Sequence, residues 1–130
     1  MEIGGYFEIE LNKNKSYHTK GLKFNYGRYA FEYILKIRNY DALYIPYYTC
    51  DVIQEILKNL NIKFFFYEID EYLKPVNHNM IVDNNIGFLY TNYFGLLDNY
   101  INQLEIKNLI VDNSQSFFSK KNPNYDSFNS

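Results

Sequence analysis

The sequence predicts an α/β fold in which a mostly parallel sheet is covered by helices on both faces, as a three-layer sandwich. Two observations predict it. Leu109–Val111 and Ile86–Tyr90 are apolar runs without polar alternation, which is typical of parallel strands buried on both faces. Segments with helical spacing of apolar residues alternate with such runs along the chain, and this order favours parallel pairing.

Residues 1–24 are expected to lead into the fold. Apolar and acidic side chains alternate over most of Tyr6–Leu11, and this pattern predicts an edge strand or a hairpin arm. A polar loop follows, and we expect His18 within it to be solvated. Asn25–Gly27 then supplies a cap and a turn for a helix predicted from about Arg28 to Arg38.

A short strand is predicted over Leu43–Ile45, closed by Pro46. A second helix follows it, and Thr49 or Asp51 is expected to cap the first turn of this helix. Its apolar positions at helical spacing are Val52, Ile53, Ile56, Leu57 and Leu60.

Lys63–Tyr67 predicts an unbroken aromatic strand. An irregular segment follows over 68–79, and His78 in this segment is expected to be exposed. After the strand that ends at Tyr90, Asp98 is expected to cap a helix that extends to about residue 104.

The whole chain, 1–130, is expected to form a single domain. It has 130 residues, 47% hydrophobic and 22% charged, which suffices for one core and is too short for two ordinary domains. We expect a lead-in over 1–24, a βα core over 25–118 and a polar tail over 119–130. The tail shows no period of its own that predicts a core element.

Charge and composition exclude some classes of function. The net charge is −2 and no Lys or Arg cluster is longer than Lys120–Lys121, so a nucleic-acid partner is not expected. The chain begins without the basic and apolar regions of a signal peptide and has no run long enough to span a bilayer. With a single Cys, these features predict a soluble cytoplasmic protein.

Asp112 is the first candidate for chemistry, because it ends a buried strand. In open parallel sheets, ligands bind where the carboxyl ends of the strands meet the amino ends of helices. A carboxylate there can hold a protonated heterocyclic nitrogen, a metal or a basic side chain, and Gln115 can add a hydrogen bond. The alternative is a plain helix cap or turn Asp after a strand.

Val111–Ser116 resembles the Asp-x-x-Gln/His segment of the DegT/StrS-type sugar aminotransferases, which are pyridoxal-phosphate enzymes of fold type I. The resemblance implies that Asp112 pairs with the pyridine nitrogen of the cofactor and that Gln115 contacts its ring hydroxyl. It also implies that the chain is part of the large domain of that fold. Three further matches follow the order of the family.

Gly27–Ala30 is similar to the Gly-Thr/Ser-x-Ala turn of the family, which holds the cofactor phosphate. A helix amino end suits phosphate, because its first amides lack internal partners and carry the positive end of the dipole. Arg28 replaces the hydroxyl residue of the family, and Tyr29 follows it. The alternative is an ordinary helix start that contains a glycine and has no role in phosphate binding.

Pro46–Cys50 resembles the Pro-x-x-Thr-aromatic segment of the family. Cys50 stands where the family places the aromatic residue that stacks on the cofactor ring, so Tyr48 or Tyr93 is a candidate to replace it. Considered without the family, Cys50 near a helix start is either a thiolate of lowered pKa or a small half-buried side chain.

Tyr90–Gly95 resembles the strand and turn of the family from which a side chain faces the cofactor, and Asn92 occupies that place. A plain strand-to-helix connection is the alternative. Ser127 and the residue after it look like the Ser-Phe pair of the family, in which the Ser contacts the phosphate. The Schiff-base lysine that follows in the family has no counterpart before Ser130.

The resemblance therefore implies the N-terminal part of an aminotransferase. The complete enzyme would use pyridoxal 5'-phosphate to move an amino group from an amino-acid donor to a nucleotide-linked keto sugar, for polysaccharide or antibiotic biosynthesis. Such enzymes are usually homodimers, and this chain alone is expected to be inactive. The alternative is a non-catalytic α/β module that binds a phosphate-bearing ligand or serves as a partner subunit. An incomplete sheet also predicts poor solubility or self-association.

Overall fold

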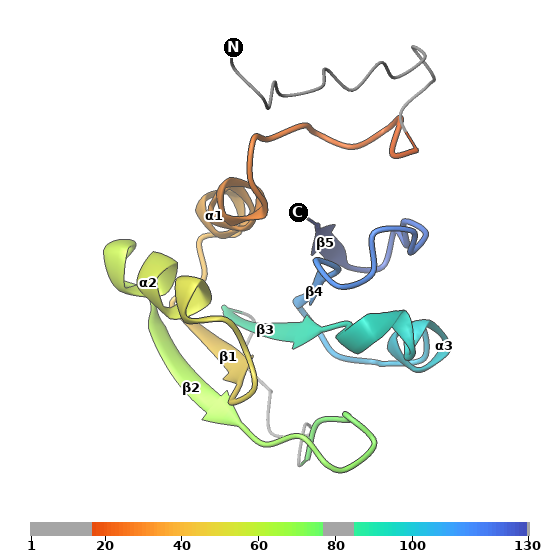
Figure 1. Ribbon diagram of the computed structural model, residues 1–130. Coiled ribbons are helices and arrows are strands. Elements are labelled where there is room, and N and C mark those ends of the chain that lie inside the picture. The colour runs from red at the N-terminus through yellow and green to blue at the C-terminus, as the bar shows by residue number, and fades with distance from the viewer. Residues whose placement is uncertain (1–16, 77–84, 130) are drawn as a thin grey trace, which may run out of the picture.

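Five strands form the central sheet of the protein (Figure 1). The structure is a computed structural model that describes residues 17–76 and 85–129. The strands lie in the order β2-β1-β3-β4-β5, and every neighbouring pair is parallel. Their bounds are Ala42–Pro46 for β1, Lys63–Tyr67 for β2, Ile86–Thr91 for β3, Leu109–Asp112 for β4 and Asp126–Phe128 for β5. The predicted α/β class with a parallel sheet is confirmed.

Helices lie on both faces of this sheet. Helices α1 (Gly27–Arg38) and α2 (Asp51–Asn59) pack on one face. The short helix α3 (Asp98–Ile101) and the 3-10 turn η2 (Tyr93–Gly95) pack on the other. The arrangement is compatible with a three-layer α/β sandwich.

Alternate residues of the strands face opposite helix layers. Leu89 and Ile110 are Cα partners and lie in the core beneath α1 and α2. Their neighbours Tyr90 and Val111 lie in the core on the α3 side. All four are fully buried. Burial on both faces explains why these strands show no polar alternation in sequence.

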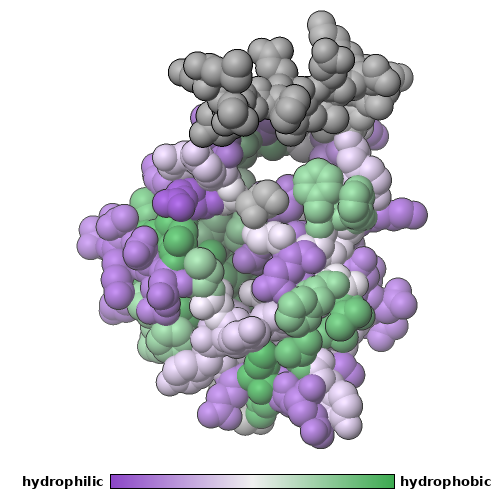
Figure 2. Space-filling model, in the orientation of Figure 1, coloured by the Kyte–Doolittle hydropathy of each residue, from purple (hydrophilic) through white to green (hydrophobic). Residues whose placement is uncertain are grey.

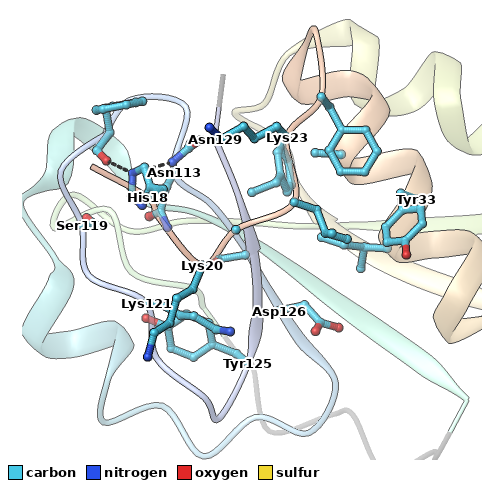
Figure 3. A pocket seen from close by; sticks show the side chains of 18 of the residues that line it. His18, Lys20, Lys23, Tyr33, Asn113, Ser119, Lys121, Tyr125, Asp126 and Asn129 are labelled. Carbon is cyan, nitrogen blue, oxygen red and sulfur yellow. Dashed lines mark hydrogen bonds between the residues drawn. The ribbon is translucent and has the colours of Figure 1, made fainter. Parts of the chain in front are cut away.

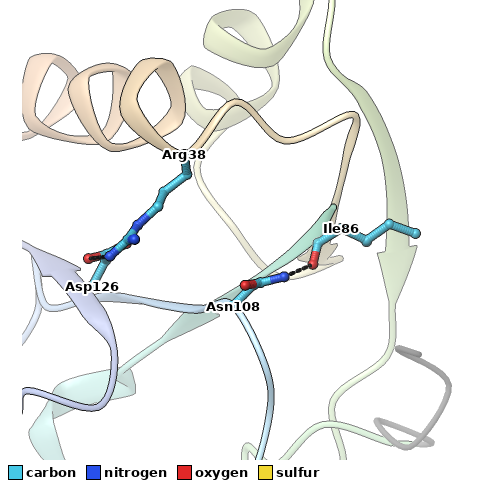
Figure 4. A network of polar contacts seen from close by, with 4 residues as sticks. All are labelled: Arg38, Ile86, Asn108 and Asp126. Atoms are coloured by element: carbon cyan, nitrogen blue, oxygen red, sulfur yellow. Dashed lines mark hydrogen bonds and ion pairs between the residues drawn. The ribbon is translucent and has the colours of Figure 1, made fainter. Parts of the chain in front are cut away.

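Helix α1 runs antiparallel to the edge strand β5. The guanidinium of Arg38, at the end of α1, donates to both carboxylate oxygens of Asp126 at the start of β5, at 2.6 and 2.9 Å (Figure 4). Nearer the start of α1, the ring of Phe31 lies 5.1 Å from that of Phe128 at the end of β5. The amino end of α1 therefore lies at the carboxyl edge of the sheet, where the strands end.

Strand β5 corrects the prediction of a polar tail over 119–130. Its three residues are too few to show a strand period, and Phe128 is its one side chain in the core. The strand is held by backbone pairing with β4, and just beyond that strand the N–H of Asn113 donates to the Phe128 carbonyl at 2.8 Å. The position of the strand therefore depends on partners that are distant in sequence.

Two capping predictions are wrong. Helix α2 has Cys50 at its N-cap, so neither Thr49 nor Asp51 occupies that position. Asp98 is the first residue of α3, Leu97 is its N-cap, and the helix ends earlier than expected. In both cases the N-cap residue makes no side-chain hydrogen bond to the helix, because the Leu side chain has no acceptor and the Cys sulfur is a weak one.

Two other predictions, the strand over Tyr6–Leu11 and the exposure of His78, lie outside the described residues. His18 is half-buried instead of solvated. Its Nε2 lies 2.6 Å from the carbonyl oxygen of Phe117, and the two rings pack edge to face. The loop before α1 is therefore attached to the loop after β4.

Large apolar side chains remain on the surface of the described residues, as Figure 2 shows for one face. Leu96, Phe118 and Leu22 are 72%, 73% and 70% exposed. Among residues 17–76 and 85–129, no helix is both long and apolar enough to cross a membrane.

Candidate functional site

The candidate site lies at the carboxyl ends of β3 and β4. Asp112 is the last residue of β4, and its Cα partners are Thr91 of β3 and Phe128 of β5. It comes two residues after Ile110, so its side chain points to the same face of the sheet, the one covered by α1 and α2. The residue is only 8% exposed.

Burial raises the pKa of Asp112, because the charged form loses its hydration. The hydroxyl and the backbone N–H of Ser114 oppose this rise, and the N–H donates to Oδ1 at 2.8 Å. Within the described residues, no cation pairs with this carboxylate. A ligand that brings a protonated nitrogen to it would supply the missing partner and lower the pKa again.

Two hydroxyl groups lie beside Asp112. Thr91 is 5% exposed, and its Oγ1 makes no hydrogen bond of good geometry within the described residues. Burial raises the pKa of the Tyr93 phenol to about 12; the nearby Thr91 hydroxyl opposes this rise, while Tyr48 and the Asp112 carboxylate add to it. The Tyr93 phenol therefore lies within electrostatic range of the Asp112 carboxylate.

Tyr93 also positions an aromatic surface at this edge. Its hydroxyl donates to the Tyr48 carbonyl at 2.7 Å, and the two rings stack with centroids 5.6 Å apart and planes inclined by 18°. Tyr93 is buried, whereas Tyr48 is 60% exposed. The Tyr48 ring is thus a flat apolar surface that Tyr93 holds in place on one side and that is open to a ligand on the other.

The amino end of α1 completes the site. Gly27 is buried, and Tyr26 at the N-cap makes no side-chain hydrogen bond to the helix. The N–H of Tyr29 donates to the Tyr26 carbonyl at 3.1 Å, which leaves the amides of Gly27 and Arg28 as the free donors that the start of a helix provides. Because α1 is antiparallel to β5, these amides lie at the same edge and face as Asp112.

The side chains of Arg28, Tyr29 and Cys50 are exposed at this edge. The guanidinium of Arg28 lies 5.9 Å from the centre of the Tyr26 ring. Cys50 is a free thiol at the start of α2. Strand β1 ends at the carboxyl edge and is followed by α2, so this thiol also lies at that edge. It is on the face of the sheet that α1 and α2 cover.

Asn92 lies on the opposite face. Its Nδ2 is 2.7 Å from Asp98, 2.9 Å from Asn113 and 3.1 Å from Ser119, so its amide connects the turns after β3 and β4. The residue is 1% exposed and faces α3. The backbone N–H of Asn92 donates to the Asp112 carbonyl at 2.9 Å, but its side chain lies on the other face of the sheet from the Asp112 carboxylate and positions the loops.

Gln115 and Ser127 are also turned away from the Asp112 carboxylate. Gln115 is exposed, and its Oε1 accepts from the N–H of Phe94 at 3.2 Å. Ser127 is the Cα partner of Val111, so by register its side chain lies on the α3 side of the sheet.

No family model, curated protein or solved structure matches this chain. The resemblance to the DegT/StrS enzymes therefore depends on its short segments and on where the structure places them. Of the proposed residues, it brings Gly27, Arg28, Tyr29, Cys50 and Asp112 to one edge and face.

Sequence reasoning missed Thr91, and it considered Tyr48 and Tyr93 only as replacements for an aromatic residue. The available signal was that Thr91 follows an apolar run directly, as Asp112 does. What places Thr91 beside Asp112 is the register of β3 against β4, and this register is not visible in the sequence.

Proposed function

We propose that this chain is the N-terminal part of a pyridoxal-phosphate-dependent aminotransferase acting on a nucleotide-linked keto sugar, and that it binds and orients the cofactor. One observation carries the proposal. A buried carboxylate without a cationic partner among the described residues, Asp112, shares an edge and a face of the sheet with the uncapped amino end of α1.

The chemistry of the residues fits such a cofactor. Pyridoxal phosphate has a basic ring nitrogen and an anionic phosphate, and it supplies an electron sink when bound. Asp112 is suited to hold the proton on the ring nitrogen, and the amides of Gly27 and Arg28 are suited to the phosphate. Tyr48 offers a flat surface for a ring.

The side chains of this chain are better suited to binding the cofactor than to catalysing transamination. Lys120 and Lys121, the first lysines after the Asp motif in sequence, line a groove beside β5. A transamination site needs an amine that moves a proton next to the cofactor. We therefore assign that amine to the complete enzyme, together with the amino-acid donor, the sugar nucleotide and a homodimeric partner.

Equilibrium dialysis against pyridoxal 5'-phosphate, read by the absorbance of the cofactor, tests the proposal. Asp112→Asn should weaken binding about ten- to hundredfold, the equivalent of the roughly 1.5–3 kcal/mol of a hydrogen bond to a charged group. Glu55→Gln removes an exposed carboxylate on α2 and should leave binding unchanged.

Equal affinity of the wild type and Asp112→Asn would refute the assignment of Asp112. Borohydride treatment followed by mass spectrometry adds a second test. Stoichiometric attachment of the cofactor to one lysine, lost in Asp112→Asn, would contradict the proposal that the reacting amine is not on this chain.

A second candidate is a non-catalytic module that binds a phosphate-bearing ligand at the amino end of α1. The uncapped start of that twelve-residue helix favours it. In this case inorganic phosphate competes with pyridoxal phosphate, and Asp112→Asn leaves the affinity for both unchanged.

A further inference from the structure

Among the described residues, the backbone groups at the outer edge of β5 have no strand partner. Strand β5 ends the sheet, and its described partner is β4 alone. The Phe128 carbonyl accepts from Asn113, so the backbone groups of Phe128 point towards β4. Because successive residues of a strand point their N–H and C=O groups to opposite sides, those of Ser127 point outwards. Such an edge is a template for a further strand.

A groove of about 950 Å³ lies along this outer edge (Figure 3). On one side it is lined by the outward face of α1, where Tyr33 is 41% and Ile37 is 60% exposed. Ala30 and Ile34 continue this apolar wall. The ring of Phe24 lies 5.3 Å from that of Tyr33, and Ala30 and Ile34 are partly buried against the core. Ile37 is therefore the most exposed part of this wall.

The other side of the groove is basic. Lys20 and Lys121 lie together beside Tyr125, across β5 from Tyr33 of α1 (Figure 3). Lys23 and Lys120 also line the groove. Of the described residues that line the groove, Asp126 is the one acidic residue, and Arg38 pairs with it. The groove therefore has an apolar side and a side with excess positive charge.

We propose that the segment Tyr6–Leu11 of this chain binds in the groove as a sixth strand beside β5. Its sequence matches both sides, because alternate residues of a strand face opposite ways. Phe7, Ile9 and Leu11 form an apolar face, and Tyr6, Glu8 and Glu10 form an acidic one. The apolar face packs on α1, and the two carboxylates approach the lysines.

The tether between the segment and the groove is short. Five residues join Leu11 to Tyr17, whose hydroxyl donates to the Phe118 carbonyl at 2.9 Å. Tyr17 itself lines the groove. An extended chain of this length spans up to roughly 20 Å. Such a tether gives a local concentration on the order of millimolar, so the segment of the same chain competes well against that of a second copy. The inference does not depend on the proposed cofactor.

Hydrogen exchange at the Ser127 amide, followed by NMR in the whole 130-residue chain, tests the strand. Ile9→Asp should speed this exchange at least about tenfold, because it puts a charge on the apolar face. Asn14→Asp adds the same charge outside the segment and should leave the exchange unchanged. The amide of Ile45 in the core strand β1 reports that the fold is intact.

Charge reversal provides a second test. Glu8→Lys combined with Glu10→Lys should also speed exchange at Ser127. Adding Lys20→Glu and Lys121→Glu should restore slow hydrogen exchange, because the segment is then basic, the groove is acidic, and their charges are complementary again.

Equal Ser127 exchange in the wild type and Ile9→Asp would overturn the proposal. Protection of Ser127 that rises with protein concentration would also overturn it, because a second copy would then occupy the groove.

Discussion

Phe128→Ala tests whether the last strand belongs to the core. The Phe128 side chain is 7% exposed, and its ring lies 5.1 Å from that of Phe31, inclined by 34°. Truncation of a buried Phe to Ala costs about 3–5 kcal/mol, and an edge strand that can relax into the space favours the lower end. We expect a loss of about 3 kcal/mol, a large part of the roughly 5–15 kcal/mol that stabilises a domain.

Urea denaturation followed by circular dichroism measures this loss. Phe118→Ala makes the same chemical change on a side chain that is 73% exposed, and should cost less than about 0.5 kcal/mol. A double-mutant cycle with Phe31→Ala should show a coupling of about 0.5–1.5 kcal/mol, as expected for two aromatic rings in contact.

Equal losses for Phe128→Ala and Phe118→Ala would refute the packing of β5. The consequence would extend to the candidate site. The contact between Phe31 and Phe128 and the ion pair between Arg38 and Asp126 hold α1 antiparallel to β5. Without them, α1 would lose the two side-chain contacts that align it with β5 and hold its amino end at the edge that carries Asp112.

Two further predictions concern stability. Burial raises the pKa of Asp112 above its ordinary 3.8, so the folded state binds this proton more tightly than the unfolded chain, and the free energy of unfolding falls as pH rises through the window above 3.8. Asp112→Asn should flatten that decline and raise Tm at pH 7. If the free energy of unfolding fell with pH as steeply in Asp112→Asn as in the wild type, the raised pKa of Asp112 would be contradicted. Gly95 has φ +69°, and an added Cβ would lie 2.7 Å from the Ser116 Oγ. Gly95→Ala should therefore cost about 1–2 kcal/mol in the same urea assay, whereas Gly21→Ala, with no atom closer than 3.8 Å, should cost little.

The sequence predicted the strands and helices that carry a strong local signal. The aromatic run Lys63–Tyr67 is β2 as expected. Strand β1 is longer than predicted by one residue at each end, and β3 and β4 differ from their predicted bounds by one residue at one end. Helix α1 follows the apolar spacing and begins one residue early, at Gly27. These elements were predictable because each shows an apolar run or an apolar spacing within its own sequence.

The site was predictable only in part. Asp112 was found because an acid that follows an apolar run marks the end of a buried strand. Asn92 and Ser127 lie on the α3 side of the sheet, because the face of a side chain depends on its parity along the strand and on the register between strands. Thr91 becomes a neighbour of Asp112 through that same register.

The sequence by itself determined that the chain forms a parallel α/β sheet, because long apolar runs have to be buried on both faces wherever they lie. It also determined that Asp112 stands at the end of a strand and Gly27 at the start of a helix. Tertiary structure alone decided that these ends share one edge, that Phe128 brings a three-residue segment into the core, and that β5 leaves an open groove. Those outcomes depend on contacts between residues distant in sequence, and local side-chain patterns do not encode the pairing of such residues.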